Sequence, residues 1–585
     1  MTGPAQAPTG SSTTGAYTTA ESVSDAPSSG GSPTGGSPTG GPASGSSLSG
    51  GEAVVRALAA HGVTDAFGIP GTHNLEIYRH LEPYGIRHVT PRHEQGAGYA
   101  ADAYARVSGR PGVAITTTGP ALLNIAAAVG QAHSDSVPLL VVSPGMPLRH
   151  PRQSTGLLHE MRSQSEALRG VAAFSHRVSS VAEIDAAVAR AFTLFRTGRP
   201  RPAHIEVPLD LLEAVEPAGP VRLAPPTGPP APDPAALEAA AAALRAARRP
   251  VLVLGGGARS AAAECRALAA ALGAPVVTTA NGKGVVDERH PLSLGVGLHS
   301  PAVQKWLADR DAVLAVGTEL AESDVWGPLP ALSGTLIRVD VDPAQMYAGI
   351  VADVPVVGDA RTVLAALLAA VDGPGRTGAD PARAGDGADL ALLVADLRTV
   401  RDDETRGRDA RWLPYLRVMR RVLAEDAVIT SDSARCCYYG ALPHLPLGPE
   451  GRYLHPTGFG TLGYALPAAI GARTACPDRQ VVALSGDGGL QFSVQELATA
   501  AQLGAPLPVV VFDNGGYGEI REEMAARGDR PTAVDLPAVD LPALARAYGG
   551  RGTAVHSPEE FAAALAEALV TPGPTVVTVP EEPSR

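Results

Sequence analysis

The sequence predicts three α/β domains in series, each with a doubly wound parallel sheet, after an N-terminal tail that is expected to be disordered. Short β-prone apolar runs alternate with helical patterns of about 10–15 residues, which is typical of parallel βαβ units. Two stretches rich in Pro or Gly, 217–234 and 372–388, interrupt this alternation and have the composition of linkers. The length of 585 residues agrees with three or four domains of roughly 150 residues each.

The tail, residues 1–49, consists almost entirely of Ser, Thr, Gly, Pro and Ala, and it holds too few large apolar groups to offset the entropy of ordering. The first domain is predicted at 50–215, the central domain at 235–372 and the third domain at 410–580. The predicted strands are the short β-prone runs 66–69, 86–89, 113–117, 139–142, 251–254, 312–316, 336–341, 481–484 and 509–512.

The composition argues against several classes of protein. Lys and Arg number 47 against 59 Asp and Glu, and the net charge of −12 disfavours binding to nucleic acid or to an acidic membrane surface. We expect no transmembrane helix and no secretory signal, because the required apolar runs are missing. The four cysteines lack the spacing of a disulfide framework or a zinc site, so a cytoplasmic location is expected.

Lysine is nearly absent, since only Lys283 and Lys305 occur. A pyridoxal phosphate or Schiff-base enzyme needs a lysine nucleophile, which leaves two candidates. Lys283 is followed by Gly284, where a P-loop requires Ser or Thr, so the sequence also argues against a P-loop ATPase.

The most informative local pattern is a single βαβ unit in the third domain. The strand at 481–484 runs into a Gly-Asp-Gly turn at Asp487, and the strand at 509–512 runs into Asn514. Residues 493–496 between them fit a capping box. Because the carboxyl ends of parallel strands meet at the ligand-binding edge of such a sheet, Asp487 and Asn514 are expected to lie together. Their oxygens suit Mg²⁺, and the glycines and helix N-terminus suit a phosphate group.

These segments resemble the signature of thiamine diphosphate-dependent enzymes in the acetolactate synthase, benzoylformate decarboxylase and pyruvate decarboxylase superfamily: Gly-Asp-Gly, a helix, then Asn-Asn. Asp513 replaces the first Asn of that motif and adds a negative charge near the diphosphate. The resemblance implies that Asp487, Asn514 and the main-chain carbonyl of Gly516 bind Mg²⁺. The further residues that it places at the cofactor are Glu94, Asn124, Asp432, Leu462, Gly486, Gly488, Gly489 and Tyr517.

The family's single essential glutamate corresponds to Glu94, at the start of the helix after the strand at 86–89. Its carboxyl would bond the aminopyrimidine ring of thiamine, and burial would favour the protonated form that this role requires. The alternative is an ordinary N-terminal acid stabilised by the helix dipole. Leu462 would hold thiamine in its bent shape, and its alternative is ordinary core packing. The segments that extend the resemblance are 68–71, 118–124 (with Ala121 in place of Gly), 135–138 and 460–469.

The sequence motifs that indicate the substrate are less specific than those that indicate the cofactor. Segment 516–521 resembles that of 5-guanidino-2-oxopentanoate (2-ketoarginine) decarboxylases, as do 156–161, 172–176 and 488–492. A guanidinium substrate would need a carboxylate partner, and Glu519, Asp432 and Glu160 are the candidates. His73 would position the substrate carboxylate or relay a proton, although a structural role fits equally well. Thr72 and Gln131 are weaker substrate candidates.

The resemblance implies Mg²⁺- and thiamine diphosphate-dependent decarboxylation of a 2-oxo acid to an aldehyde and CO₂. The alternatives are a carboligase of the acetolactate synthase type, a catalytically inactive regulatory paralogue, and an NAD-dependent oxidoreductase based on 255–257. FAD in the central domain is conceivable but is not favoured by so loose a fingerprint. In the family, Glu94 and the diphosphate site come from different subunits, so a homodimer or homotetramer is expected. Neither nucleic acid nor a membrane is an expected partner.

Overall fold

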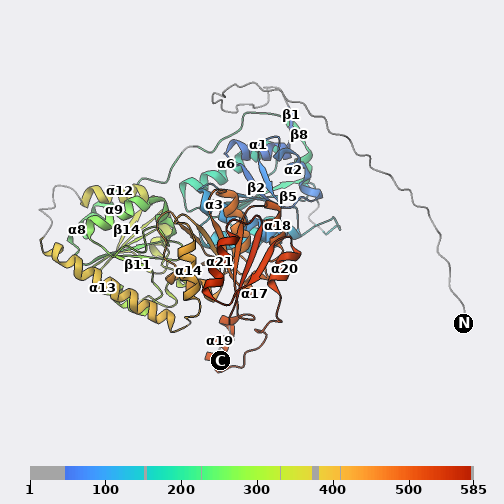
Figure 1. Cartoon of the computed structure of the whole chain (residues 1–585). Coiled ribbons are helices and arrows are strands. Elements are labelled where there is room, and N and C mark those ends of the chain that lie inside the picture. Colours follow the sequence, from blue (N-terminus) through green and yellow to red (C-terminus); the bar gives the residue numbers. More distant parts are fainter. Residues whose placement is uncertain are drawn as a thin grey trace, which may run out of the picture. The chain divides into compact units, whose positions relative to one another are not determined.

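The computed structural model describes residues 47–150, 154–225, 227–329, 331–371, 381–408 and 410–581. Within them lie three six-stranded parallel α/β sheets, which confirms the predicted fold class (Figure 1). Residues 47–49, assigned above to the tail, instead form strand β1 (Ser47–Ser49), which pairs antiparallel with β8 (Val215–Pro217). The rest of the expected tail, 1–46, lies outside the described residues. The predicted domain boundaries stay a prediction.

The first sheet has the strand order β3-β2-β4-β5-β7-β6. Residues along β4 alternate between two cores: Val113 and Ile115 pack with α1 and α6, whereas Ala114 packs with α3 and α4. This alternation is what a sheet covered by helices on both faces requires. The strands are β2 (Asp65–Gly68), β3 (Arg87–Val89), β4 (Gly112–Ile115), β5 (Leu139–Gly145), β6 (Phe174–Arg177) and β7 (Ala203–Pro208). The helices are α1 (Gly50–Ala60), η1 (Thr72–Asn74), α2 (Leu75–Leu81), α3 (Glu94–Ser108), α4 (Pro120–Ser134), α5 (Gln164–Arg169), α6 (Val181–Thr197) and α7 (Leu209–Glu213).

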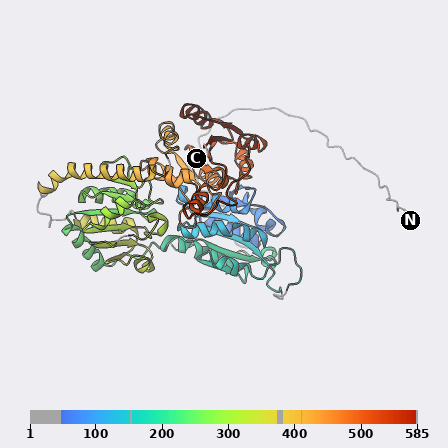
Figure 2. The ribbon, with the colours of Figure 1, turned by 90° about the horizontal axis from the view of Figure 1, so that it is seen from below.

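The central sheet has the order β11-β10-β9-β12-β13-β14, the arrangement of a dinucleotide-binding Rossmann domain. Its long last helix, α13, begins at Pro381, inside the stretch predicted as the second linker, and it runs past β11 toward the third domain (Figure 2). The strands are β9 (Pro250–Leu254), β10 (Val276–Thr278), β11 (Ser293–Val296), β12 (Ala312–Val316), β13 (Thr335–Asp340) and β14 (Val354–Val357). The helices are α8 (Pro234–Ala246), η2 (Gly256–Ala261), α9 (Ala262–Leu272), α10 (Pro301–Ala308), α11 (Glu322–Val325), η3 (Pro343–Tyr347), α12 (Ala360–Val371) and α13 (Pro381–Arg406).

The third sheet has the order β16-β15-β17-β18-β20-β19. Numbered within each domain, this order is 2-1-3-4-6-5, the same as in the first sheet, so the first and third domains share one topology. The strands are β15 (Val428–Ser431), β16 (Arg452–Leu454), β17 (Val481–Gly486), β18 (Leu507–Asp513), β19 (Arg551–Ala554) and β20 (Pro574–Pro580). The helices are α14 (Leu413–Val422), η4 (Cys436–Ala441), α15 (Leu442–His444), α16 (Ala465–Ala475), α17 (Asp487–Leu490), α18 (Glu496–Leu503), α19 (Gly518–Ala526), α20 (Leu541–Ala547) and α21 (Pro558–Ala568).

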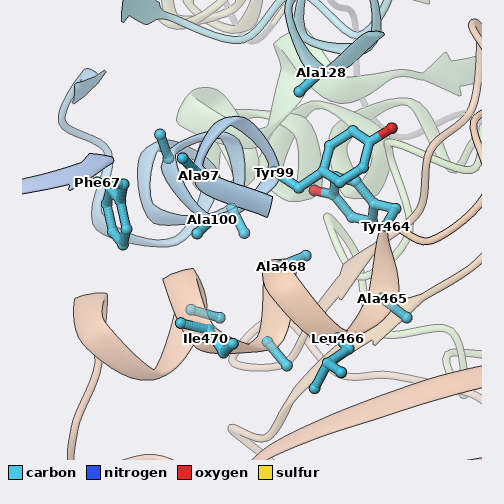
Figure 3. Close-up of a cluster of buried hydrophobic side chains, with 14 of the residues drawn as sticks. Phe67, Ala97, Tyr99, Ala100, Ala128, Tyr464, Ala465, Leu466, Ala468 and Ile470 are labelled. Carbon is cyan, nitrogen blue, oxygen red and sulfur yellow. The ribbon is translucent and has the colours of Figure 1, made fainter. Parts of the chain in front are cut away.

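The first and third domains meet where α3 packs on α16 (Figure 3). Small residues on both helices let the backbones approach closely, and a Cβ at Gly471 would lie 1.9 Å from the carbonyl oxygen of Ala100. At one end of this contact the rings of Tyr99 and Tyr464 meet edge to face, with centroids 5.4 Å apart. The core formed by these helices is continuous across both domains.

Polar contacts extend the junction to the central domain. Arg106 on α3 donates to the side-chain oxygen of Asn281 at 2.7 Å, and it lies 3.5 Å from the carboxylate of Asp135. The Nδ2 of Asn281 donates to the same carboxylate at 3.1 Å, and the guanidinium of Arg106 also bonds the Tyr464 hydroxyl. One largely buried arginine, with 14% of its side chain exposed, therefore links all three domains. In the described part of the chain, no helix is both long and apolar enough to cross a membrane.

Candidate functional site

The ends of β17 and β18 bring Asp487 and Asn514 together, as the sequence predicts. The two strands pair in parallel, with Gly486 opposite Phe512. The backbone N–H of Asn514 donates to Oδ1 of Asp487 at 3.2 Å. The site therefore lies at the carboxyl edge of the third sheet.

One side-chain oxygen at this edge lacks a hydrogen-bond donor within the described chain. Oδ1 of Asn514 is buried and has no hydrogen-bond partner among the described residues. A Cβ at Gly488 would lie 3.1 Å from the carbonyl oxygen of Gly516 and 3.2 Å from the ring of Tyr517, so the loop after β18 closes tightly over α17. Burial, and then the carboxylate of Asp513, raise the pKa of Asp487 to about 6. A bound cation would relieve both costs, so this oxygen set fits a hard metal ion.

The set contains one carboxylate, one amide oxygen and one main-chain carbonyl. Consistently, the described residues include no group of three or more His, Cys, Asp or Glu side chains that could hold a metal. Mg²⁺ commonly completes such a sparse protein set with water and with phosphate oxygens from its partner molecule. The geometry therefore favours a metal that bridges to a phosphorylated ligand.

Asp432 organises the loops beside this edge. Its buried carboxylate accepts hydrogen bonds from the backbone N–H groups of Gly463 and Ser433, at 3.0 and 2.9 Å, and from the Ser485 hydroxyl. Burial raises its pKa to about 6. A Cβ at Gly489 would lie 3.2 Å from the Asp432 carboxyl carbon. The Asp432 carboxylate thus holds three loops together. Because its oxygens already accept these hydrogen bonds, it is not available to bind a substrate guanidinium.

Leu462 lies in the loop that Asp432 anchors through Gly463. It is partly exposed and belongs to none of the buried apolar clusters of the described chain. Ordinary core packing therefore does not account for Leu462. Through Gly463 and Asp432 its loop is held beside the carboxyl end of β15, next to the point where the strand order of the sheet reverses and where ligands commonly bind in such sheets.

Glu94 occupies the first position of α3, at the carboxyl edge of the first sheet. The side-chain Nδ2 of Asn124, on α4, donates to Oε2 of Glu94 at 2.9 Å. The sequence predicted a buried glutamate, but in this chain Glu94 is partly exposed and Asn124 is exposed. The reason is that α3 and α4 present this pair outward from the domain edge, so a single chain does not enclose it.

The remaining predicted substrate residues have different surroundings. Nδ1 of His73 lies 2.6 Å from the Thr118 hydroxyl, and the neighbouring Thr72 is exposed. Gln131 is buried and donates to Asp135 at 2.7 Å, so it supports the domain junction. Glu160 accepts three backbone N–H groups of its own loop, from Thr155, Gly156 and Leu157.

Glu519, on α19, is the candidate carboxylate that lies nearest to Asn514 in the sequence. It accepts a 2.6 Å hydrogen bond from the Tyr439 hydroxyl and lies 3.4 Å from Arg435. Its side chain keeps 28% of its surface exposed. Arg435 also pairs with Glu522, so it would retain an acidic partner if Glu519 turned toward another cation. Of the three proposed guanidinium partners, Glu519 has the most exposed side chain, because Asp432 is buried and the Glu160 side chain is only 10% exposed.

Glu496 is a residue whose place in the structure the sequence did not indicate. Its carboxylate accepts the backbone N–H groups of Arg92 and His93, both at 3.0 Å, and the Thr499 hydroxyl at 2.6 Å. The predicted capping box at 493–496 is therefore wrong, because Glu496 caps the helix of Glu94 in another domain and not its own helix. The local pattern Ser-x-x-Glu gave no sign of a partner about 400 positions away.

A cavity of about 730 Å³ lies at the carboxyl edge of the central sheet, lined among others by Gly256, Asn281 and Asp340. The strand that carries the ribose-binding acid in dinucleotide-binding domains is β10, and here it ends in Thr278 followed by Thr279. The acid at the end of β13, Asp340, is paired with Arg199 at 2.8 Å. These residues do not fit a dinucleotide, so neither FAD nor NAD is assigned to the cavity.

Comparison with known proteins agrees with the geometry. Three family models match: the N-terminal TPP binding domain of thiamine pyrophosphate enzymes at 48–167, their central domain at 237–367 and their C-terminal TPP binding domain at 436–579. The chain is 42% identical over 515 residues to a probable 2-ketoarginine decarboxylase of Pseudomonas aeruginosa, which covers 87% of this chain and 89% of the relative.

Other relatives carry the name acetolactate synthase. The large subunit from Parasynechococcus marenigrum is 34% identical over 556 residues, covering 91% of this chain and 87% of the relative. The isozyme 3 large subunit from Escherichia coli is 30% identical over 549 residues, covering 89% and 92%. The resemblance seen in the sequence is thus confirmed, and the chain belongs to the thiamine pyrophosphate-dependent enzymes.

Proposed function

We propose that this chain decarboxylates a 2-oxo acid with thiamine diphosphate and Mg²⁺, releasing an aldehyde and CO₂. The observation that carries the proposal is the buried, unpartnered Oδ1 of Asn514 beside the Asp487 carboxylate, at the carboxyl edge of the third sheet. When bound, thiamine diphosphate supplies the carbon nucleophile and the electron sink that this reaction needs. The name of the Pseudomonas aeruginosa relative supports a decarboxylase.

The roles proposed for the chain's own residues follow from their positions. Asp487, Asn514 and the Gly516 carbonyl hold Mg²⁺, and the backbone N–H groups around Gly486, Gly488 and Gly489 line the space for the diphosphate. Tyr517 closes the loop over this space. Asp432 fixes the loop of Leu462, which supports the bent cofactor. Glu94 hydrogen-bonds the aminopyrimidine ring, and Asn124 orients the Glu94 carboxyl.

We further propose that the active enzyme is a homodimer or a homotetramer. Glu94 and Asn124 are incompletely covered in one chain, and Leu75 and Leu123 expose about half of their surfaces on the same domain. A second copy would cover these apolar groups and bury Glu94 against the other chain's Mg²⁺ edge. A cytoplasmic location also stays a prediction.

The proposed substrate is 5-guanidino-2-oxopentanoate, with Glu519 as the partner of its guanidinium. Release of CO₂ from this compound, from pyruvate and from benzoylformate tests the assignment, with thiamine diphosphate and Mg²⁺ present. We expect the guanidino compound to give the highest kcat/KM. Turnover of pyruvate alone, with acetolactate as product, would instead establish the carboligase that the acetolactate synthase relatives suggest.

Replacing Asp487 by Asn is expected to weaken Mg²⁺-dependent binding of thiamine diphosphate at least ~10-fold, because the only carboxylate of the ligand set is lost. Calorimetric titration of the metal-free protein, with and without Mg²⁺, measures the change. Asp529→Asn, on the loop after α19, is the matched control and should bind as the unchanged protein does. Equal affinities for Asp487→Asn and the control would remove Asp487 from the site.

Replacing Glu519 by Gln is expected to raise KM for 5-guanidino-2-oxopentanoate roughly 10-fold or more, since a hydrogen bond to a charged group contributes about 1.5–3 kcal/mol. KM for a 2-oxo acid of similar length whose side chain carries no charge should change little. Glu523→Gln, an exposed acid on the same helix, serves as the control. An equal rise in KM for the guanidino substrate and for the substrate with an uncharged side chain would show that Glu519 only supports the local structure.

A further inference from the structure

Two histidines of the first domain share one hydroxyl group. Nδ1 of His73 lies 2.6 Å from the Thr118 oxygen, and Nδ1 of His159 lies 3.1 Å from the same atom. The two rings meet edge to face, with centroids 5.5 Å apart. His73 is in η1, which follows β2, Thr118 is on the loop after β4, and His159 is on the segment that follows β5. The chain therefore assembles this contact from three separate segments at one sheet edge.

The backbone is shaped to bring His159 to this position. His159 has φ of +62°, a left-handed conformation that costs free energy in a residue other than glycine. A Cβ at Gly119 would lie 2.5 Å from the carbonyl oxygen of His159, so only glycine permits this approach. The buried side chain of Gln164 accepts the Gly119 N–H at 2.6 Å and donates to the Pro144 carbonyl at 2.7 Å. Such support for a strained residue suggests a functional constraint.

Counting hydrogens fixes the relation between the two rings. The Thr118 hydroxyl has one hydrogen, so it donates to Nδ1 of one neutral ring and accepts from Nδ1–H of the other. The two histidines are then opposite tautomers, one with a proton on Nε2 and one with a bare Nε2. Burial, and then the neighbouring His159, lower the pKa of His73, which keeps that ring neutral at neutral pH.

We propose that His159 and Thr118 act through His73 as a proton relay for the decarboxylation assigned above. This inference rests on the proposed function, because decarboxylation of a 2-oxo acid anion to an aldehyde consumes one proton in each turnover. His73 is the ring nearer the proposed active site, since its segment shares the sheet edge with Asn124 and Glu94. His159 is the ring nearer the solvent, since Leu157 and Leu158 beside it are exposed.

The proton balance of the relay is complete. His73 gives the Nε2 proton to the substrate carbon, Nδ1 of His73 takes the Thr118 proton, and the Thr118 oxygen takes the proton from Nδ1 of His159. Nε2 of His159 then takes one proton from water. When the aldehyde has left, water protonates Nε2 of His73, and Nδ1 of His73 returns its proton to the Thr118 oxygen. Thr118 in turn returns its hydrogen to Nδ1 of His159, and Nε2 of His159 releases its proton to water. The net change is one solvent proton delivered to the product.

Thr118→Val and Thr118→Ser form the decisive pair. Valine keeps the volume of threonine and removes the hydroxyl, so kcat for CO₂ release should fall by about 10²-fold, within the range of lost general acid catalysis, while KM stays the same. Serine keeps the hydroxyl and should restore most of kcat. His159→Gln should lower kcat to a similar extent. The double variant Thr118→Val/His159→Gln should have a kcat no lower than that of the slower of these two single variants. Wild-type kcat in Thr118→Val, or effects that multiply in the double variant, would overturn the relay.

A second measurement does not depend on turnover. In protein with ¹⁵N-labelled histidine, solid-state NMR distinguishes Nδ1–H from bare Nδ1, and the variants His73→Gln and His159→Gln assign the two rings. Opposite tautomers in the wild type, lost in Thr118→Val and kept in Thr118→Ser, would support the shared hydroxyl, and identical tautomers would overturn it. Failure of all three 2-oxo acids to release CO₂ would contradict the proposed function, whereas the NMR result would still decide the hydrogen-bonded chain.

Discussion

Replacing Glu94 by Gln is expected to lower kcat for CO₂ release by about 10²–10⁴-fold, the usual contribution of a positioned acid or base. Glutamine has nearly the same shape and can still bond Asn124 Nδ2 through its oxygen, so α3 and α4 should keep their packing. It cannot share or release a proton, however, so the aminopyrimidine would lose its acidic partner. The rate is measured with saturating thiamine diphosphate and Mg²⁺.

The control for Glu94→Gln is Glu82→Gln, which changes an exposed carboxylate of the same domain. It should leave kcat unchanged. If Glu94→Gln also left kcat unchanged, Glu94 would be only an N-terminal acid stabilised by the helix dipole, the alternative that the sequence left open. A fall in kcat without a fall in thermal stability would place the effect in the reaction.

Replacing Lys283 by Met is expected to destabilise the protein by about 3–5 kcal/mol, because it leaves a buried carboxylate without its partner. Nζ of Lys283 lies 2.6 Å from Oε2 of Glu288, and both side chains are less than 5% exposed. Nζ also donates to the Leu442 carbonyl at 2.9 Å, and Glu288 accepts the Leu447 N–H at 2.8 Å. The pair thus joins the central domain to the third, and its loss should loosen that junction.

Thermal unfolding followed by calorimetry measures the effect. At ~2–4 °C per kcal/mol for a domain of ordinary size, Tm should fall by roughly 6 °C or more. Lys305→Met changes the exposed lysine on α10 and is the matched control. Adding Glu288→Leu to Lys283→Met should recover part of the loss, because the orphaned charge is then removed. A Tm for Lys283→Met equal to that of the control would show that the ion pair contributes nothing.

The sequence predicted those parts of the fold and site that depend on local pattern. Strands such as β17 and β18 are apolar runs of strand length, and the parallel topology alone requires Asp487 and Asn514 to meet. The family signature assigned Glu94 to the other half of the site. The prediction for Asp487 and Asn514 needed only spacing, residue type and the geometry of a βαβ unit, whereas the assignment of Glu94 depended on the family resemblance.

Contacts between distant segments could not be predicted in this way. Strand β1 forms only because residues 215–217 lie beside it, and alone its Ser-rich sequence resembles the tail. Glu496 looks like a local helix cap, but its acceptors are satisfied by Arg92 and His93 in another domain. His159 reaches Thr118 through a backbone turn that no residue pattern specifies. In each case the deciding partner is set by tertiary packing and not by neighbours in the chain.

The burial of Lys283 has a practical consequence for labelling. Lys305 is the only lysine left exposed, so an amine-reactive dye applied to the folded protein can attach there and at the α-amino group and nowhere else. The α-amino group titrates more than about two pH units below lysine, so blocking it first at neutral pH leaves one dye site per chain. Counting photobleaching steps in single particles would then give the number of subunits directly.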